Sequence, residues 1–447
     1  MKNDLSVKQN LETMLSPIRL RESGAKRNEF DARNAFDSDY SRIVVSSYFR
    51  RLQDKAQVFP LAESDFLRTR LTHSLEVSTF ARGIGLGVER HLIENGYLSE
   101  EKYGYIPSIL SVSGLIHDIG NPPFGHSGEK SISNSFKKLT KKDSFSEIEK
   151  KDFENFDGNV QGFRILTKLS LSKDDYSYNL TCPTLASIIK YPYSSVEGNV
   201  KDKDNIFKKK FGFFNSEKSR YEDIINKLSL KQGQRHPLAY LLESADDIAY
   251  SVCDLEDGHR LRIISFDNIY NEFEKRGLKE SLGDYKAYKE NPDLYIQDLR
   301  IKFQSKMIKD SIKVFTDNIE KIVGGGFNKE IIEESESKEH REAFKTLGLL
   351  NFNHDSVLLR EVIGDKVINN LMDIFYNTIK ALRDGKPTGI NKKEFSLVSV
   401  NIRNKNLYNK SIEELSDYEC FMLTADYVSG MTDNFALNMY QKLNGMK

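Results

Sequence analysis

The stretch LRTRLTHSLEVSTFARGIGLGVERHL, residues 67–92, decides the fold class of this 447-residue chain. Its apolar residues recur every three or four positions over about six helical turns, which is typical of an amphipathic helix. They form two rows, the first made of Leu67, Leu71 and Leu75 and the second of Val77, Phe80, Ile84, Val88 and Leu92. We therefore expect one long helix here, with its apolar rows facing a core.

The same spacing predicts helices in three other parts of the chain. Residues 237–256 carry an apolar stripe behind Pro237, a residue favoured in the first turn of a helix. Residues 107–118 predict a shorter apolar helix, and residues 412–443 also show mainly helical spacing. The run FSLVSVNI, residues 395–402, alternates and predicts a short strand. The expected class is all-α with few short strands.

Three charge-rich segments are predicted to be loops or flexible inserts. They are residues 137–158, residues 197–235 with their many lysines, and residues 324–342, which begin with three glycines. We find no internal repeat and no proline-rich linker, so the chain is not divided into independent domains.

Composition excludes several classes of protein. The 66 Lys and Arg balance the 66 Asp and Glu, so no global charge attracts nucleic acid or an anionic membrane. Cys182, Cys253 and Cys420 are isolated, which rules out a disulfide framework and a CxxC-type zinc site. The amino-terminal MKNDLSVKQN has no apolar signal region, and no apolar run reaches the roughly 18 residues of a membrane span. We expect a soluble cytoplasmic protein with no membrane contact.

Adjacent His117 and Asp118 are the first candidates for chemistry. They end the apolar helix expected over residues 107–118, where a carboxylate meets the negative end of the helix dipole. A bound divalent cation would remove that penalty because it becomes the largest local charge. A hydrogen-bonded pair in the core explains the two residues equally well.

An acidic row on the helix expected over residues 237–256 supplies a further candidate. Spacings of three, four and four place four polar side chains in one row, namely Glu243, Asp246, Tyr250 and Asp254. Asp247 points about 100° away from Asp246. Burying such a row is costly without a cation or a hydrogen-bonding ligand, whereas a solvated flank is the ordinary alternative.

His73 lies on the apolar side of the helix expected over residues 67–92. A single histidine there is more often a hydrogen-bonded core residue than a ligand. Together with His117, Asp118 and Asp246, however, it completes a mixed nitrogen and oxygen set. Such a set suits Mn²⁺, Mg²⁺, Fe²⁺ or Zn²⁺ and leaves coordination positions for water and a substrate oxygen.

The strings around these residues carry a family resemblance. They are RLQDKAQVFPL, RTRLTHSLEV, GLIHDIGNPPFGHSGE, KYPY, ESADDIAYSVCDLEDG and DYVSGMTDNFAL. The chain resembles the HD-domain deoxynucleoside triphosphate triphosphohydrolases over residues 25–445. The resemblance implies an all-α HD-type fold with additional helices in one large domain, residues 1–447. Within it we expect an HD core over about residues 65–260 and a helical carboxy-terminal portion over about residues 325–447.

The resemblance also implies roles for individual residues. The four members of the mixed set correspond to the ligands of a single divalent metal ion. His126 and Glu129 match the catalytic pair beside the α-phosphate, although from the sequence alone His126 is better explained as a turn histidine. Gln53 and Asp254 match residues that bind the sugar 3′-hydroxyl, and Tyr250 matches the ring against the deoxyribose.

Four further residues match contacts to the triphosphate: Arg70, Lys190, Tyr191 and Lys210. The ordinary alternative for Arg70 is a surface arginine at a helix start. Lys210 is chosen from the run Lys208–Lys210 because it directly precedes Phe211, and its two neighbours are expected to be solvated.

The expected reaction is metal-dependent hydrolysis of dGTP, or of other dNTPs, to a deoxynucleoside and inorganic triphosphate. The resemblance further implies a homo-oligomer, often a hexamer. Two alternatives stay open, namely another HD-type nucleotide phosphohydrolase and a regulator that binds nucleotide or single-stranded DNA through lysine-rich residues 201–231. No P-loop motif occurs, and the glycines of RGIGLGVE are better explained by helix packing than by dinucleotide binding.

Overall fold

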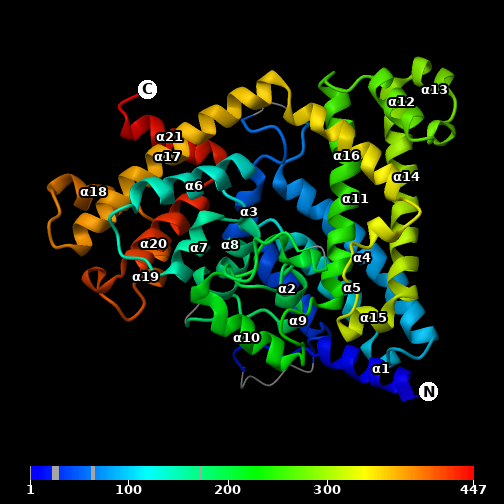
Figure 1. The fold of residues 1–447 in the computed structure, drawn as a ribbon, viewed down its shortest axis with the longest axis horizontal. Coiled ribbons are helices and arrows are strands. Elements are labelled where there is room, and N and C mark those ends of the chain that lie inside the picture. The colour runs from blue at the N-terminus through cyan, green and yellow to red at the C-terminus, as the bar shows by residue number, and fades with distance from the viewer. Residues whose placement is uncertain (1, 23–29, 62–65, 171–173, 203, 447) are drawn as a thin grey trace.

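The computed structural model describes residues 2–22, 30–61, 66–170, 174–202 and 204–446, and these are almost entirely helical (Figure 1). Within these ranges β-structure is limited to three isolated bridges. The helices are α1 (Lys2–Met14), α2 (Ala35–Val44), α3 (Ser47–Arg51), α4 (Arg70–Glu94), α5 (Tyr105–Ile116), α6 (Gly125–Leu139), α7 (Glu147–Glu154), α8 (Gly158–Arg164), α9 (Cys182–Ser187), α10 (Lys218–Lys227), α11 (Pro237–Arg260), α12 (Phe266–Lys275), α13 (Tyr285–Glu290), α14 (Pro292–Asp317), α15 (Ile319–Gly324), α16 (Lys338–Phe352), α17 (Asp355–Arg383), α18 (Gly389–Leu397), α19 (Val400–Asn406), α20 (Asp417–Ser429) and α21 (Asp433–Leu443). The predicted all-α class is confirmed.

The long helix expected over residues 67–92 is α4, which begins later than predicted. Thr69 caps it by accepting a hydrogen bond from the backbone of Thr72, so Leu67 lies outside the helix. The second apolar row is in the core, apart from partly buried Phe80. In the first row, Leu71 and Leu67 are partly buried against hydrophobic clusters, whereas Leu75 is 44% exposed. Only the Leu75 end of that row therefore faces outward.

The other predicted helices correspond to α5, α11, α20 and α21. The strand expected over residues 395–402 is wrong, because this run ends α18 and begins α19. Val398 and Ile402 are buried, while Val400 between them is exposed. Burial four residues apart fits a helix, whereas a strand would bury all three on one face.

The charge-rich segments are also more helical than predicted. Residues 137–158 contain α7, residues 197–235 contain α10, and α16 begins inside residues 324–342. Lys and Glu are good helix formers, and at α7 a cap also supplies the start that the sequence pattern did not reveal. There, Ser146 and Glu149 form a reciprocal capping box.

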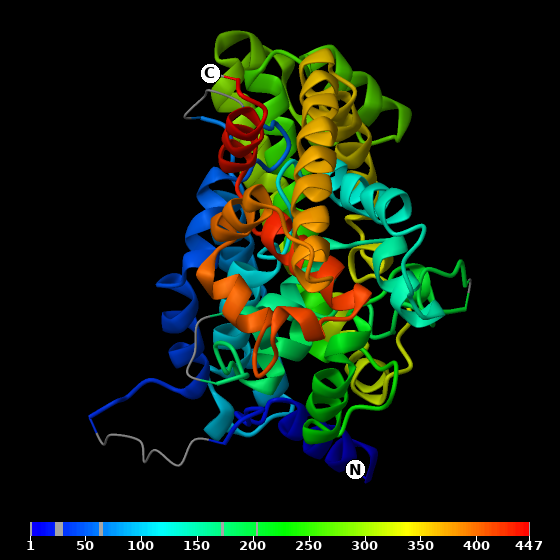
Figure 2. The ribbon, with the colours of Figure 1, turned by 90° about the vertical axis from the view of Figure 1, so that its left-hand side faces the viewer.

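Two hydrophobic cores fill the molecule. The larger includes residues of α4, α5, α11, α14 and α16, and the smaller joins α6–α8 to α17, α20 and α21. In Figure 1, α11, α14 and α16 run side by side, and α17 leads away from them toward α6 and α20. The two ends of the chain lie at opposite ends of the molecule in both views (Figures 1 and 2).

Glycines set the closest helix contacts. A Cβ atom on Gly114 of α5 would lie 2.4 Å from the Cα atom of Ser78 on α4, so this crossing requires a residue without a side chain. Gly85 and Gly87 of α4 are likewise crowded, by α5 and by Ile312 of α14, which agrees with helix packing. In the described part of the chain no helix has the length and apolarity needed to cross a membrane.

Candidate active site

The close crossing of α4 and α5 brings two histidines together. His73 projects from the first turns of α4, and His117 follows the last residue of α5. Their ring centroids are 5.3 Å apart. Asp246 of α11 completes a group whose ligand atoms all lie within 4.8 Å of one another. The structure therefore brings together residues that are 44 and 129 positions apart in the chain.

Hydrogen bonds orient His117 as a ligand. Its Nδ1 atom is 2.8 Å from the carbonyl oxygen of Gly114, so Nδ1 carries the proton and Nε2 keeps a lone pair. The Nε2 atom is buried, has no hydrogen-bond partner among the described residues, and lies 3.5 Å from Asp246 Oδ1. Metal-binding histidines typically donate their other ring N–H to a carbonyl or carboxylate in this way.

Asp118 lies beside this group, and two side chains outside the group donate hydrogen bonds to its carboxylate. Arg70 Nη1 donates to its Oδ2 at 2.6 Å, and Asn121 Nδ2 donates to its Oδ1 at 2.6 Å. Its Oδ1 atom is 3.6 Å from His117 Nε2. Asp246 is shared in a similar way, because Oδ1 is 3.2 Å from His73 Nε2 while Oδ2 accepts from Lys190 Nζ at 2.7 Å.

Charge coupling keeps both carboxylates ionised. Burial raises their pKa values, but His117 and Arg70 outweigh it at Asp118, and Lys190 and His117 outweigh it at Asp246. Both pKa values are therefore lowered. Burial alone would lower the pKa of His117, yet the two carboxylates raise it above its usual value. Such concentrated negative charge on oxygen is suited to a cation.

The residues fit a divalent metal ion. Two neutral imidazole nitrogens and two ionised carboxylates form the donor set that Mn²⁺, Fe²⁺ and Zn²⁺ accept. The lone pair of His117 and the Oδ1 atoms of the carboxylates converge, and a bound ion would give the buried Nε2 atom its missing partner.

His126 and Glu129 form a second pair at the start of α6. His126 Nδ1 is 2.9 Å from Glu129 Oε2, and Glu129 Oε1 accepts from the backbone N–H of Gly158 at 2.7 Å. The hydrogen bond that His126 donates to the Glu129 carboxylate raises the pKa of the imidazole above its usual value. The carboxylate is buried, while the imidazole is exposed at the mouth of a cavity.

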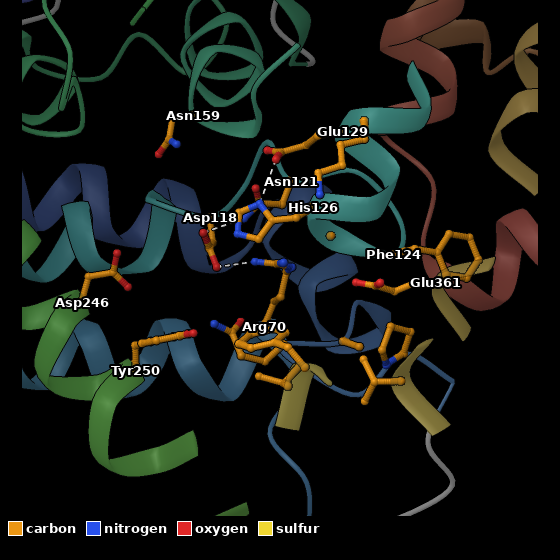
Figure 3. Close-up of a pocket in the computed structure, with 18 of the residues that line it drawn as sticks. Arg70, Asp118, Asn121, Phe124, His126, Glu129, Asn159, Asp246, Tyr250 and Glu361 are labelled. Atoms are coloured by element: carbon orange, nitrogen blue, oxygen red, sulfur yellow. Dashed lines mark hydrogen bonds and ion pairs between the residues drawn. The ribbon is translucent and has the colours of Figure 1, made fainter. Parts of the chain in front are cut away.

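That cavity has a volume of about 500 Å³, within the usual range for small-molecule sites. Figure 3 shows Asp246 and Tyr250 at one side, Glu361 and Phe124 at the other, and Arg70 between them. Most of the predicted residues line it: Arg70, Asp118, His126, Glu129, Lys190, Tyr191, Lys210, Asp246 and Tyr250. His73 and His117 are buried directly behind Asp246.

The structure places two predicted sugar contacts differently. Gln53 is exposed and does not line the cavity, whereas Gln57 does, with a buried Oε1 atom that no described residue contacts by a hydrogen bond. Asp254 is buried one turn beyond Tyr250 and does not itself line the cavity. Its Oδ2 atom is also unpartnered within the described ranges.

Other lining residues escaped the sequence analysis. Asn121 sits in the quoted string GLIHDIGNPPFGHSGE, so its position three residues after Asp118 could have indicated it. Phe352 and Glu361 come from the end of α16 and the start of α17. The ring of Phe352 stacks near that of Tyr250, with centroids 6.5 Å apart. Nothing in their local sequence indicated a site.

Comparisons with known proteins agree with this geometry. The HD-domain family model matches residues 70–178, which include His73, His117, Asp118 and the pair on α6. A Listeria innocua protein called deoxyguanosinetriphosphate triphosphohydrolase-like is 37% identical over 97% of this chain and 99% of its own length. A Synechocystis protein of the same description is 33% identical over 97% of this chain and 99% of its own length.

A Yersinia enterocolitica protein described as deoxyguanosinetriphosphate triphosphohydrolase is 29% identical, over 93% of this chain and 95% of its own length. The similarity to these three proteins extends over nearly the full length of each. The chain belongs to the HD-domain family of deoxyguanosinetriphosphate triphosphohydrolase-like proteins.

Proposed function

We propose that this protein hydrolyses a deoxynucleoside triphosphate, with dGTP as its substrate, to the deoxynucleoside and inorganic triphosphate. One observation carries the proposal. A single cavity is lined by Asp118 and Asp246, two of the four proposed metal ligands, and by three cationic side chains, Arg70, Lys190 and Lys210, while His73 and His117 are buried behind Asp246. A metal for the α-phosphate beside cations for the remaining charge is the combination that phosphoryl chemistry requires.

The metal ligands and Arg70 have separate roles, which follow from their places in the site. A divalent ion held by His73, His117, Asp118 and Asp246 would act as Lewis acid toward an α-phosphate oxygen and lower the pKa of an attacking water. Arg70, held beside Asp118, is placed to neutralise charge that develops on the α-phosphate.

The proton is handled by the pair on α6. Attack of water at the α-phosphorus breaks its bond to the 5′-oxygen of the nucleoside, which must then gain a proton. Glu129 fixes the ring of His126 through Nδ1, so Nε2 exchanges the proton. The backbone N–H of Gly158 keeps Glu129 in place.

Guanine selection is assigned to Glu361. Its side chain lines the cavity at the end opposite Asp246 (Figure 3). A carboxylate accepts hydrogen bonds from the N1–H and N2–H₂ groups of guanine, whereas adenine presents an acceptor at N1. We expect Glu361→Gln to reduce the preference for dGTP over dATP about tenfold or more, the usual effect of a lost charged hydrogen bond.

We assign the sugar hydroxyl contact to Gln57, with Tyr250 against the ring, while Asp254 is buried one turn beyond Tyr250 and outside the cavity lining. Gln57 replaces the Gln53 of the sequence prediction because its buried oxygen lines the cavity. A buried polar partner left without its hydrogen bond gives strong discrimination. A 2′,3′-dideoxynucleotide should therefore be a poor substrate, and Gln57→Ala should lower kcat/KM for dGTP far more than Gln53→Ala.

The decisive experiment incubates the purified protein with Mn²⁺ and each dNTP, GTP, a nucleoside monophosphate and a cyclic nucleotide. Chromatography should detect inorganic triphosphate with dGTP above all. His117→Ala should abolish its release, whereas His91→Ala, at an exposed histidine of α4, should not. Release of single phosphates or hydrolysis of monophosphates would favour another HD-type phosphohydrolase.

Self-association belongs to the same proposal. Apolar side chains are exposed on α16 and α17 next to the cavity mouth: Leu349, Leu350, Leu358, Leu359 and Val362. Contiguous exposed apolar surface is typical of an interface, and we assign it to a second copy of the chain. Light scattering after gel filtration should give an oligomer that dissociates in the variant Leu359→Glu.

A further inference from the structure

The string DYVSGMTDNFAL, residues 426–437, has no part in the proposed chemistry, although its turn reaches the site from the far end of the chain. It covers the end of α20, the turn Ser429–Thr432 and the start of α21. Its Asp433 is 3% exposed and belongs to the first turn of α21, where the helix dipole favours a carboxylate. Both of its carboxylate oxygens accept hydrogen bonds from backbone N–H groups that are distant in the sequence.

Asp433 joins two walls of the cavity. Its Oδ1 accepts from the N–H of Phe124 at 3.0 Å, and its Oδ2 accepts from the N–H of Ala56 at 3.0 Å. These donors lie 309 and 377 residues away in the chain. Ala56 and Phe124 both line the cavity, so one buried carboxylate fixes their separation.

The backbone conformation of Phe124 is unfavourable and needs the support of this hydrogen bond. Its φ angle of 62° lies in the left-handed region, which is unfavourable for a residue other than glycine. It directly precedes α6, which begins at Gly125, where φ is 57°. His126 and Glu129 follow within the first turns of that helix. The direction in which α6 leaves this turn therefore places the pair that handles the proton.

Lys55 adds a second tie between the same segments. Its buried Nζ donates to the carbonyl oxygen of Asn121 and, at 3.1 Å, to that of Ser429. Asn121 is the residue that holds Asp118 through its side-chain amide. The tie therefore links the carboxy-terminal turn to the metal-ligand end of residues 118–126.

Asp426 is linked to α6 indirectly, through α8. It accepts hydrogen bonds from Gln161 and Arg164 of α8, with 3.0 Å to Gln161 Nε2 and 2.9 Å to Arg164 Nε. The first residue of α8 is Gly158, whose N–H holds Glu129. Both acidic residues of the string thus act on the segment that carries the catalytic pair.

We propose that the turn Ser429–Thr432 and the adjoining Asp433 position the reaction centre. Asp433 and Lys55 set the geometry of residues 118–126 without touching substrate. This inference rests on the proposed function. A displacement of about 1 Å at reacting groups typically lowers rate by up to two orders of magnitude. The triphosphate is held by cations on other elements, so the loss should fall on kcat.

The test compares Asp433→Asn with Asp417→Asn. Asp417 opens α20 and likewise accepts from a distant backbone N–H, that of Ser144 at 2.7 Å, and from Lys380 at 2.7 Å. Neither of those partners lines the cavity. It is therefore a matched control for the loss of a structural carboxylate in the same part of the fold.

We expect Asp433→Asn to lower kcat about 10- to 100-fold with KM within threefold of wild type, at a temperature where both variants are fully folded. Hydrogen–deuterium exchange of peptides covering residues 119–125 should increase in Asp433→Asn alone. Asp417→Asn should keep kcat, even if its Tm falls as much. Unchanged kcat in Asp433→Asn, or unchanged exchange at residues 119–125, overturns the proposal.

Lys55→Met supplies a second variant if Asp433→Asn does not fold, since it keeps the packed aliphatic stem. The same fall in kcat and the same rise in exchange are expected, and their absence overturns the proposal. If the wild-type protein releases no triphosphate from any dNTP, the proposed function fails. The exchange measurement still decides whether the carboxy-terminal turn holds residues 118–126.

Discussion

At the scale of single residues, the site depends on which atoms are left without protein partners. His117 Nε2, Gln57 Oε1 and Asp254 Oδ2 are buried and accept no hydrogen bond from any described residue. Leaving a buried polar atom unpaired costs about 1–3 kcal/mol. Gln57 Oε1 belongs to the lining of the cavity, whereas His117 and Asp254 do not line it, and we expect a bound metal ion to supply the missing partner of His117 Nε2.

Removing the charge of Asp246 should affect metal binding differently from removing the charge of the adjacent Asp247. Asp246 faces the two histidines, whereas Asp247 pairs with Arg341 of α16 at 3.1 Å. Asp246→Asn should lower metal occupancy, measured by elemental analysis of Mn²⁺-loaded protein, far more than Asp247→Asn. The reverse order would show that α11 presents a different face to the metal.

Buried Asp254 should lower the free energy of unfolding of the protein increasingly as pH rises. Burial, with a contribution from Asp257, raises its pKa well above the ordinary carboxyl value. The folded state then holds a proton that the unfolded state has released, so stability falls as pH rises above about 4. Asn carries no such proton. Asp254→Asn should therefore gain Tm relative to wild type, and the gain should grow from pH 5 to pH 8.

Thermal melts at pH 5, 6.5 and 8 check this, with Asp298→Asn on the exposed side of α14 as control for the charge change. The stabilised variant should hydrolyse dGTP more slowly. A Tm difference that is independent of pH would contradict the assignment of a raised pKa to this carboxyl.

The sequence indicated His73, His117 and Asp246, which the structure brings together, more directly than it indicated the residues that line the cavity. His73 and Asp246 were indicated by helical phase together with the family strings, and α4 and α11 present them as expected. Residues 53 and 57 are both glutamines. Only the path of the folded chain after α3 shows that Gln57, and not Gln53, lines the cavity. Asp433 could not be assigned at all, because its partners lie more than 300 residues away.

At the scale of elements, the strongly periodic helices could be predicted and the short ones could not. α4 and α11 each bury long regular rows, so their pattern stands out from chance. The run over residues 395–402 is too short to distinguish periods of two and four, and it was predicted as a strand. α7 depends on its capping box, and α10, which has no side-chain cap, buries Tyr221, Ile224 and Ile225 in the core; hydrophobic spacing alone does not reveal either.

The crossing of α4 and α5 gives an element-scale prediction. A Cβ atom at Gly114 would meet the backbone of Ser78, whereas at Gly83 it would meet nothing within 4 Å. Gly114→Ala should lower the free energy of unfolding by about 1–3 kcal/mol, the usual cost of overpacking. Separating the two helices also separates His73 from His117, so metal occupancy should fall.

Gly83→Ala is the matched control in α4. It should raise the free energy of unfolding by up to about 1 kcal/mol, because alanine favours a helix over glycine. Urea titration and elemental analysis of both variants check the pair. Equal effects at the two positions would show that the close crossing does not determine the metal site.

At the scale of the whole molecule, the cavity lies where the two hydrophobic cores meet. Asp246 and Tyr250 come from α11 in the larger core, and Phe124 and Glu361 come from elements that pack in or against the smaller one. Val58, Phe59 and Val357 form a small third cluster between them. A ligand in this cavity contacts both cores at once and should stabilise them together.

A slowly hydrolysed dGTP analogue should therefore shift the unfolding of the entire chain. At 100 times its Kd, such a ligand adds about 2.7 kcal/mol to the free energy of unfolding. With an unfolding entropy of about 2.1 cal/mol/K per residue, that corresponds to a rise in Tm of about 3 °C. Calorimetry should show every transition moving upward with analogue and Mn²⁺, and none moving in His117→Ala. If the analogue shifts only one of two resolved transitions, the ligand touches a single core, and the placement of guanine at Glu361 across the cavity from Asp246 is wrong.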